Sequence, residues 1–287
     1  MSGKELLYHY TTVESLLGII ESGALWATHI HYLNDTSEAH LLWDQIRVVI
    51  DSRLENPDET KRDALSELRQ FASAPTYGDI YVVSFSKDGG DRLSQWRGYG
   101  GAGGVAIGFN IAALQAKCTK IPEVGAERDK PIRMTDFSFF MSVAPVMYVN
   151  PEGDDVSLNI INKLISDPLA PVSGLTREKL FGRRVSFLAS RLKHSAFDEE
   201  KEWRVLIIDH WRNLPTRFRY RQSMVVPYVL FRLGSSPGHL DWASISRIVV
   251  GPSAHQQETI EAIKNMIAKV VGREIQVVGS KIPYRDW

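Results

Sequence analysis

The pattern near the C-terminus restricts the fold more than any other part of the sequence. Residues 245–250 and 274–278 have the composition of strands, and the periodicity of residues 256–270 predicts a helix between them. Two strands joined through one helix must pair in parallel, because the helix carries the chain back to the end of the sheet at which the first strand began. The sequence therefore predicts a C-terminal βαβ unit within a sheet.

The first residues predict a strand, a helix and a second strand in quick succession. Residues 6–10 have strand composition, and the Thr-Thr-Val-Glu sequence beginning at Thr11 has the form of a capping box, which marks the start of a helix. The expected apolar face of this helix consists of Val13, Leu16, Leu17 and Ile20. Gly23 is expected to end the helix in the left-handed conformation, and residues 24–28 then resume an extended strand.

Runs of β-branched and aromatic residues predict the remaining strands. These runs lie at residues 80–86, 105–109, 133–140, 143–149, 202–208 and 217–226. Helices are expected over residues 180–192 and over residues 38–71, where a break near Asn56 and Pro57 separates two helices that would cover one side of the sheet. Weak periodicity and many prolines make residues 117–176 an expected insertion in a single domain spanning residues 1–287.

The charge balance excludes a global attraction to nucleic acid or to an anionic membrane. The chain has 34 Lys and Arg residues and 34 Asp and Glu residues, so such a partner would need a local patch. Cys118 is the only cysteine, which excludes a disulfide framework and a cysteine-rich zinc site. Because the sequence has no apolar signal core and no run of about 18 apolar residues, we expect a cytoplasmic protein without a membrane partner.

Two motifs suggest chemistry but have a simpler structural interpretation. Residues 98–103 fit the G-x-G-x-x-G pattern of dinucleotide-binding folds, yet that pattern must open a helix and here leads into the strand at residues 105–109. A flexible turn is therefore expected, with a mobile lip over a site as the functional alternative. His29 and His31 could face the same way and bind a metal, but no nearby spacing completes a ligand set, and no metal is expected.

Three arginines alternate with aromatic residues on the strand expected at residues 217–226. Arg217, Arg219 and Arg221 would share one face of this strand. One interpretation is a solvated edge strand that charge protects against aggregation. The other is a face that binds nucleic acid or phosphate, because guanidinium groups match phosphate oxygens.

Polar residues interrupt strands where a core prefers apolar side chains. Ser84 and Ser86 share a face of one strand, and Glu202 and Arg204 share a face of another. Together with His9 on the first strand, these residues suggest a site along one side of the sheet. A carboxylate beside an arginine and aromatic rings could orient a sugar hydroxyl and stabilise an oxocarbenium-like transition state.

Several short segments, read in order, resemble the prokaryotic family called domain of unknown function 2971. The segments are residues 7–11, 25–28, 32–35 with Glu38, 84–86, 95–99, 200–204, 250–252 and 282–285. They are spread over the whole chain, which makes the resemblance specific. The family label carries no established chemistry.

The chain also resembles the ADP-ribosyltransferase superfamily. A first strand with His9, then a helix, a glycine and a strand, is similar to the opening of that superfamily, while residues 84–86 and 200–202 look like its Ser-Thr-Ser strand and its Glu-x-Glu motif. The resemblance implies an α+β fold with a central split β-sheet, covering helices and the added C-terminal βαβ unit. It implies NAD-dependent ADP-ribosyl transfer or NAD glycohydrolysis inside the cell, as in a toxin or phage-defence effector.

Roles for individual residues follow from this resemblance alone. Glu202 would hydrogen-bond the nicotinamide ribose and promote cleavage of the glycosidic bond, and His9 would bond to the same ribose rather than to a core partner. Tyr99 or Trp96 would stack on nicotinamide. The other residues expected around NAD are Arg97 or Arg204 at the pyrophosphate, with Tyr10, Thr11, Ser84, Ser86, Asn34 and Glu38. The arginine stripe is expected outside this ribose site.

Two other functions stay open. The first is a non-catalytic nucleotide or nucleic-acid binding module that uses the arginine stripe. The second is a different hydrolase, in which His9 acts as the base and Glu202 or Glu38 acts as the acid. For the transferase, the macromolecular acceptor would be a nucleic acid or a protein.

Overall fold

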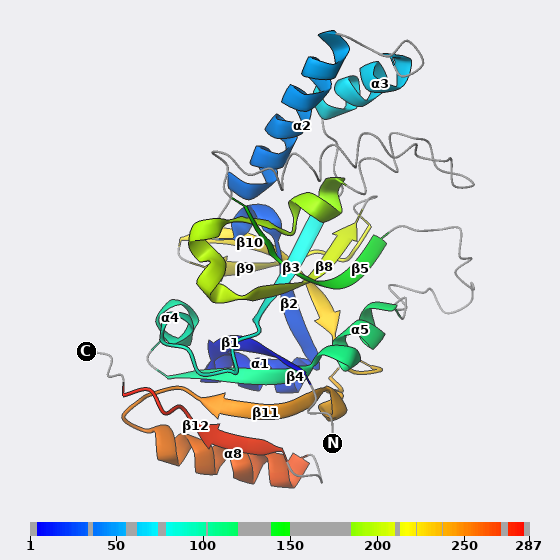
Figure 1. Cartoon of the computed structure of the whole chain (residues 1–287). Coiled ribbons are helices and arrows are strands. Elements are labelled where there is room, and N and C mark those ends of the chain that lie inside the picture. The colour runs from blue at the N-terminus through cyan, green and yellow to red at the C-terminus, as the bar shows by residue number, and fades with distance from the viewer. Residues whose placement is uncertain are drawn as a thin grey trace, which may run out of the picture.

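The chain forms an α+β structure built on one large mixed sheet (Figure 1). The computed structural model describes residues 5–33, 37–55, 62–73, 79–101, 103–119, 139–149, 185–209, 213–221, 223–236, 238–270 and 275–283. Most of the expected insertion at residues 117–176 lies outside this range, as do residues 133–138 and most of the helix expected at residues 180–192, of which residues 185–189 are helical.

The N-terminal strand lies in the middle of the sheet. Strand β1 (Leu6–Thr12) pairs with β4 (Gly104–Asn110) along its whole length, in antiparallel orientation. Beyond β4 lie β11 (Ile245–Val250) and then β12 (Gln276–Gly279). The last two strands are parallel and are joined through α8 (Gln256–Val270), which confirms the predicted βαβ unit.

Strand β3 (Asp79–Ser86) has three neighbours at its two edges. One edge pairs with all of β8 (Glu202–Asp209). The other edge pairs with β1 at Ser86, and with β2 (Ala24–His29) at Tyr81 and Val82. Because β1 and β2 meet opposite ends of the same edge, the sheet is open between them.

The remaining strands extend the sheet on both sides of this opening. Strand β5 (Phe139–Pro145) pairs with β8, while β10 (Met224–Arg232) pairs with β2 and with β9 (Arg217–Arg221), the last strand in that direction. The prediction of one strand over residues 217–226 was therefore wrong, because Ser223, with φ of 68°, lies in a reversal between two strands.

The strand expected at residues 143–149 is also interrupted. It is divided between β5 and β6 (Met147–Val149), and the amide of Val146 between them donates to the carbonyl of Glu202, which continues the register of β5 with β8 by one residue. Strand β6 pairs in parallel with β7 (Leu192–His194) in a small second sheet.

Helix α1 (Val13–Ser22) begins one residue later than its sequence suggests. Thr12 is the N-cap, and its hydroxyl accepts a hydrogen bond of 3.1 Å from the amide of Ser15. The helix buries Leu16 and Ile19, whereas Leu17, which was expected on the buried face, is 45% exposed. Gly23 ends the helix in the left-handed conformation, as predicted.

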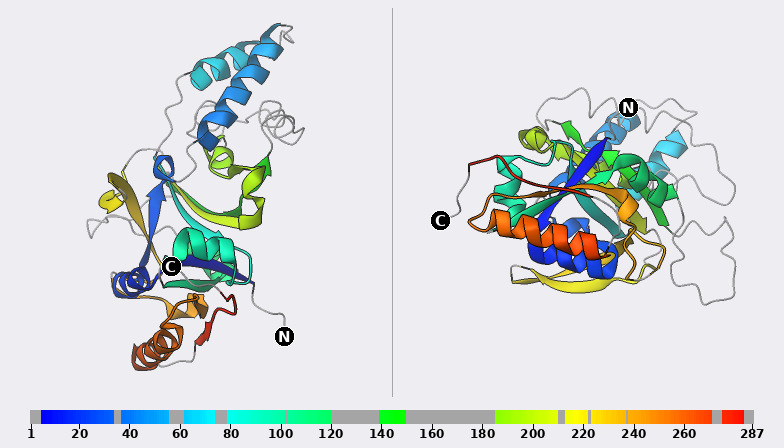
Figure 2. Two further views of the ribbon diagram at one scale, coloured as in Figure 1. Left: turned by 90° about the vertical axis from the view of Figure 1, so that its left-hand side faces the viewer. Right: turned by 90° about the horizontal axis from the view of Figure 1, so that it is seen from below.

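The predicted break near Asn56 and Pro57 is confirmed, since α2 (Ser37–Glu55) and α3 (Arg62–Ser73) are separate helices. Their predicted place on the sheet was wrong. The two helices pack on each other and extend away from the large sheet, and α2 contacts the small sheet at β7 (Figures 1 and 2). Within the part of the chain that the structure describes, no helix is long and apolar enough to cross a membrane.

Shorter helical segments connect these elements. They are α4 (Leu93–Gln95), α5 (Ile111–Thr119) and the turns η1 (Ile30–Tyr32), η2 (Trp96–Gly100), η3 (Ser195–Glu200) and η4 (Trp242–Ser244). The glycine-rich stretch after Trp96 thus forms the π-helical turn η2 and leads into β4, as expected of a turn rather than a dinucleotide-binding loop.

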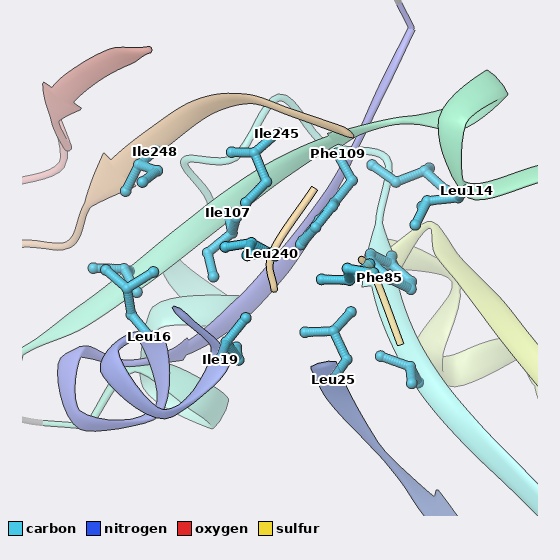
Figure 3. Close-up of a cluster of buried hydrophobic side chains, with 14 of the residues drawn as sticks. Leu16, Ile19, Leu25, Phe85, Ile107, Phe109, Leu114, Leu240, Ile245 and Ile248 are labelled. Atoms are coloured by element: carbon cyan, nitrogen blue, oxygen red, sulfur yellow. The ribbon is translucent and has the colours of Figure 1, made fainter. Parts of the chain in front are cut away.

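The main core lies between α1 and one face of the sheet (Figure 3). Leu16 and Ile19 of α1 face Ile107 and Ile248, and Phe85 meets Phe109 edge to face at 5.7 Å. Burial of such side chains contributes about 1.5–3 kcal/mol each. This packing fixes α1 against the strands on one side of the sheet opening.

Gly23 provides a test of the junction that follows α1. Its φ is 65°, and an added Cβ would lie 2.4 Å from the carbonyl oxygen of His239, so we expect Gly23→Ala to lower the free energy of unfolding by about 1–2 kcal/mol or more. Gly18 is the matched control, because it is helical with nothing within 4 Å of an added Cβ, and Gly18→Ala should stabilise by about 0.5–1 kcal/mol. Urea unfolding of both variants checks this, and equal midpoints would contradict it.

Candidate functional site

A cavity of about 800 Å³ lies beside the opening between β1, β2 and β3. Cavities that bind small molecules have volumes of roughly 300–1,000 Å³. The predicted site residues that line this cavity are His9, Tyr10, Thr11, Ser84, Ser86, Tyr99, Glu202, Arg219 and Arg221. The structure therefore brings together side chains from β1, β3, β8, β9 and η2.

The opening lets residues from both faces of the sheet reach one cavity. His9 lies opposite Ile107, so its side chain is on the face of the main core, and its ring lies 5.7 Å from that of Phe85. Ser84 and Ser86 flank Phe85 on β3 and therefore point to the other face. In a continuous sheet these two sets of side chains would be separated by the backbone.

The imidazole of His9 bridges β1 and β3 where they do not pair. Its Nδ1 atom donates a hydrogen bond of 2.9 Å to the carbonyl oxygen of Ser84, so the expectation that His9 would have no core partner was wrong. Burial lowers the pKa of His9 below its ordinary value; the Ser84 carbonyl opposes this effect and the Arg219 charge adds to it. At neutral pH the ring is therefore uncharged, with its proton on Nδ1 and with Nε2 able to accept.

Glu202 is held in a buried network of charges. Its Oε1 atom accepts a hydrogen bond of 2.8 Å from Nε of Arg204. Its Oε2 atom accepts from Nη2 of Arg204 at 3.1 Å and from Nζ of Lys193 at 3.0 Å. Glu202 is only 6% exposed, so each of these bonds acts in a medium that screens charge weakly.

The network keeps Glu202 ionised. Burial alone favours the protonated carboxyl, but the Arg204 guanidinium, the Lys193 ammonium and a hydrogen bond from the Ser84 hydroxyl outweigh it and lower the pKa of Glu202 to about 2. Glu202 can thus accept hydrogen bonds and stabilise positive charge. A hydrolase in which Glu202 supplies a proton is disfavoured by the same observation.

The register of β3 and β8 explains the position of Arg204. Arg204 lies opposite Ser84 and Glu202 lies opposite Ser86, which confirms the shared face expected for each pair. Nη1 of Arg204 also donates to the carbonyl of Ser190 at 2.8 Å. Arg204 is 2% exposed and does not line the cavity, so it holds Glu202 in place rather than contacting a ligand.

Lys193 also belongs to this network, although the sequence did not predict it. Its Nζ atom, 2.7 Å from Glu200 and 3.0 Å from Glu202, joins the two carboxylates. Burial disfavours the ammonium, but Glu202 and Glu200 raise the pKa of Lys193 above its ordinary value. Lys201, with φ of 44°, forms the turn that brings Glu200 and Glu202 to the same cation. The Glu-x-Glu spacing could have prompted a search for a buried lysine, but no local pattern singles out Lys193.

The aromatic candidates have different environments. Tyr99 lines the cavity and is 37% exposed, and burial, then the Glu200 charge, raises its pKa. Trp96 is buried, does not line the cavity, and donates from Nε1 to Asp91 at 2.9 Å. Tyr10 donates to Asp88 at 2.9 Å and meets Trp96 edge to face. Tyr99 is therefore the aromatic ring of η2 that a ligand can reach.

Three more predicted residues are not placed at the cavity. Arg97 is exposed and does not line it. Asn34 lies outside the described residues, and Glu38 belongs to α2 but its side chain lies outside them.

Two of the three stripe arginines line the same cavity as His9 and Glu202. Arg219 and Arg221 line it, whereas Arg217 is exposed and does not. Strand β9 is adjacent to β10, which pairs with β2, and this order brings the stripe to the opening in the sheet. The spacing of the arginines in the sequence does not show that β9 lies beside β10, and therefore close to β2.

His29 and His31 lie close together, with ring centroids 5.2 Å apart. Nε2 of His29 lies 3.6 Å from Oδ1 of Asp79, and Nδ1 of His29 accepts from the amide of His31. Among the described residues, no group of three or more His, Cys, Asp or Glu side chains is arranged to hold a metal ion.

Part of this site lies within a match to a known protein family. Residues 95–205 match the family described as protein of unknown function, DUF2971. The match includes Tyr99 and the network of Lys193, Glu202 and Arg204, while His9 and the arginines of β9 lie outside it. No curated protein and no solved structure matches the chain. The likeness to ADP-ribosyltransferases stays a prediction.

The charge network predicts a pH dependence of stability. Because the pKa of Glu202 falls from 4.5 to about 2 on folding, its contribution is complete above about pH 4.5 and is lost as the pH drops toward 2. Glu202→Gln should remove this part of the dependence and cost about 3–5 kcal/mol at neutral pH, since it leaves buried cations without their carboxylate. Glu199→Gln, the same change at an exposed neighbour, should do neither. Urea unfolding as a function of pH measures both, and parallel curves for the two variants would exclude the assignment.

Proposed function

We propose that the protein cleaves NAD and transfers ADP-ribose to an acceptor, or to water as an NAD glycohydrolase. The observation that carries the proposal is the convergence of His9, Ser84 and Glu202 on one cavity. They lie on β1, β3 and β8, and β3 lies between the other two strands. The opening between β1 and β3 supports a sheet of the split ADP-ribosyltransferase type.

The proposed reaction breaks the bond between the nicotinamide nitrogen and the ribose carbon. Nicotinamide leaves with the electron pair of that bond, which neutralises its ring and leaves positive charge on the ribose. The acceptor oxygen or nitrogen then bonds to this carbon and loses a proton. A fixed carboxylate near the ribose stabilises the charge that develops in the transition state.

The ionised Glu202 suits this role, and its neighbours determine how a substrate reaches it. A carboxylate has about four acceptor positions, which Arg204, Lys193 and Ser84 already occupy. The Ser84 hydroxyl can rotate, whereas the two cations are fixed by further bonds. A ribose hydroxyl can therefore replace Ser84 on Glu202 while the cations stay in place.

The uncharged imidazole of His9 supplies a second acceptor, in addition to the carboxylate of Glu202. Its Nε2 atom can accept a hydrogen bond from a ribose hydroxyl or take the proton that the acceptor loses. Tyr99, which lines the same cavity, provides an accessible ring for nicotinamide. Inside a cell, such a reaction would consume NAD or modify a macromolecule, nucleic acid or protein, which is the chemistry of a toxin or phage-defence effector.

The direct test is release of nicotinamide from NAD by the pure protein. We expect Glu202→Gln to lower turnover by about 100-fold or more, because a positioned charge typically contributes on that scale. Glu199→Gln should retain the wild-type rate. Circular dichroism and a melting temperature above the assay temperature must show that Glu202→Gln is folded. Equal turnover of folded Glu202→Gln and wild type would refute the role of Glu202.

The lowered pKa of His9 predicts the acid limb of the rate profile. If neutral His9 is required, turnover should persist at pH 6.5 and decline only as the pH falls through the lowered pKa. Arg219→Gln should move this decline toward higher pH, because one cause of the lowered pKa is removed. Rates across pH, with a folded His9→Gln variant as reference, check this. A His9→Gln profile that keeps the wild-type acid limb would rule His9 out as its source.

A further inference from the structure

We propose that Arg219 and Arg221 form a diphosphate-binding subsite of the cavity, next to an aromatic wall that receives a nucleobase. The inference rests on the proposed function only in naming NAD as the natural diphosphate. Both arginines lie on one face of β9 and line the cavity. In this proposal the pyrophosphate is bound by Arg219 and Arg221 and not by Arg97 or Arg204, which were expected there but do not line the cavity.

Arg219 is positioned before any ligand arrives. Its Nη2 atom donates a hydrogen bond of 2.7 Å to the hydroxyl of Thr28. Its guanidinium also lies over Trp26, 5.3 Å from the ring centroid, and 5.8 Å from that of Tyr228. A guanidinium fixed in this way loses little conformational freedom when it binds an anion.

The two arginines have no counter-ion among the described residues. No ion pair joins either of them to a carboxylate there, and the Nε atom of Arg219 is buried without an acceptor. The carboxylates of Glu200 and Glu202 are already paired with Lys193 or Arg204. A buried donor on a cation without an acceptor costs free energy, so the cavity is arranged to take an anion at this end.

The shape of the pair favours phosphate. Guanidinium groups present planar forks that bind phosphate oxygens through two parallel hydrogen bonds. Two such forks, two residues apart on a strand, suit two linked phosphates rather than one carboxylate. Burial, then the neighbouring Arg221 charge, lowers the pKa of Arg219, and a bound anion would relieve the repulsion between them.

The wall beside the arginines is aromatic. Trp26 lines the cavity, is 44% exposed and stacks on Tyr228 at 4.6 Å. Exposed indole next to fixed cations is the combination that binds a nucleobase attached to phosphate. The ligand class that fits this end of the cavity is therefore a nucleoside diphosphate, and ADP-ribose is its form in the proposed reaction.

Calorimetry with ADP-ribose and with adenosine tests the subsite without any turnover. Arg219→Gln and Arg221→Gln should each weaken ADP-ribose binding by about 10-fold or more, because each removes a charged hydrogen-bond donor. Binding of adenosine, which has no phosphate, should change little. Arg217→Gln is the matched control on the same strand outside the cavity and should leave both affinities unchanged.

Wild-type affinity for ADP-ribose in the folded Arg219→Gln and Arg221→Gln variants overturns the subsite, as does equal weakening by Arg217→Gln. An absence of ADP-ribose binding to the wild-type protein also overturns it, and salt-dependent oligonucleotide binding that the arginine variants abolish would then favour a nucleic-acid interface. Arginine-dependent ADP-ribose binding without nicotinamide release supports the subsite while the proposed function fails.

Discussion

The pairing of β3 is the constraint on which the site depends. One edge of β3 is taken by β8, and the other is shared by β1 and β2 at opposite ends. Hydrogen bonding along β3 is therefore incomplete on one side, and the carbonyl of Ser84 in that gap is satisfied by His9 instead of by a strand. The same gap creates the opening and fixes the imidazole that faces it.

The buried charges around Glu202 are the second feature that determines the site. Glu202 and Arg204 at the start of β8 are charged and buried, which is unfavourable unless every charge is paired. Arg204, on the same strand as Glu202, forms an ion pair with it. Lys193 of β7 forms ion pairs with both Glu202 and Glu200. The network is stable only while all its members are present, so it holds the carboxylate in one position. It also ties the small sheet to the large one beside the cavity.

Local patterns in the sequence predicted most strands and helices, because apolar runs and caps depend on neighbouring residues. The βαβ unit, the cap at Gly23 and the break after α2 are examples. The hairpin of β9 and β10 was missed because alternation continues through Ser223 without a glycine or proline to mark the turn. The placement of α2 and α3 was wrong because an apolar face shows that a helix is covered but not by what.

For the site, too, the sequence predicted what depends on neighbouring residues and not what depends on distant segments. Shared faces on one strand, such as Glu202 with Arg204, follow from a period of two. Lys193 reaches Glu202, and Arg219 reaches the cavity, only through pairings between distant segments. Those pairings bring two unlike sets of charges to one cavity. The charge around Glu202 is balanced, whereas Arg219 and Arg221 have no counter-ion among the described residues. A ligand with a neutral sugar at one end and phosphates at the other matches this asymmetry, whereas a uniform polyanion would place phosphates against the ionised Glu202.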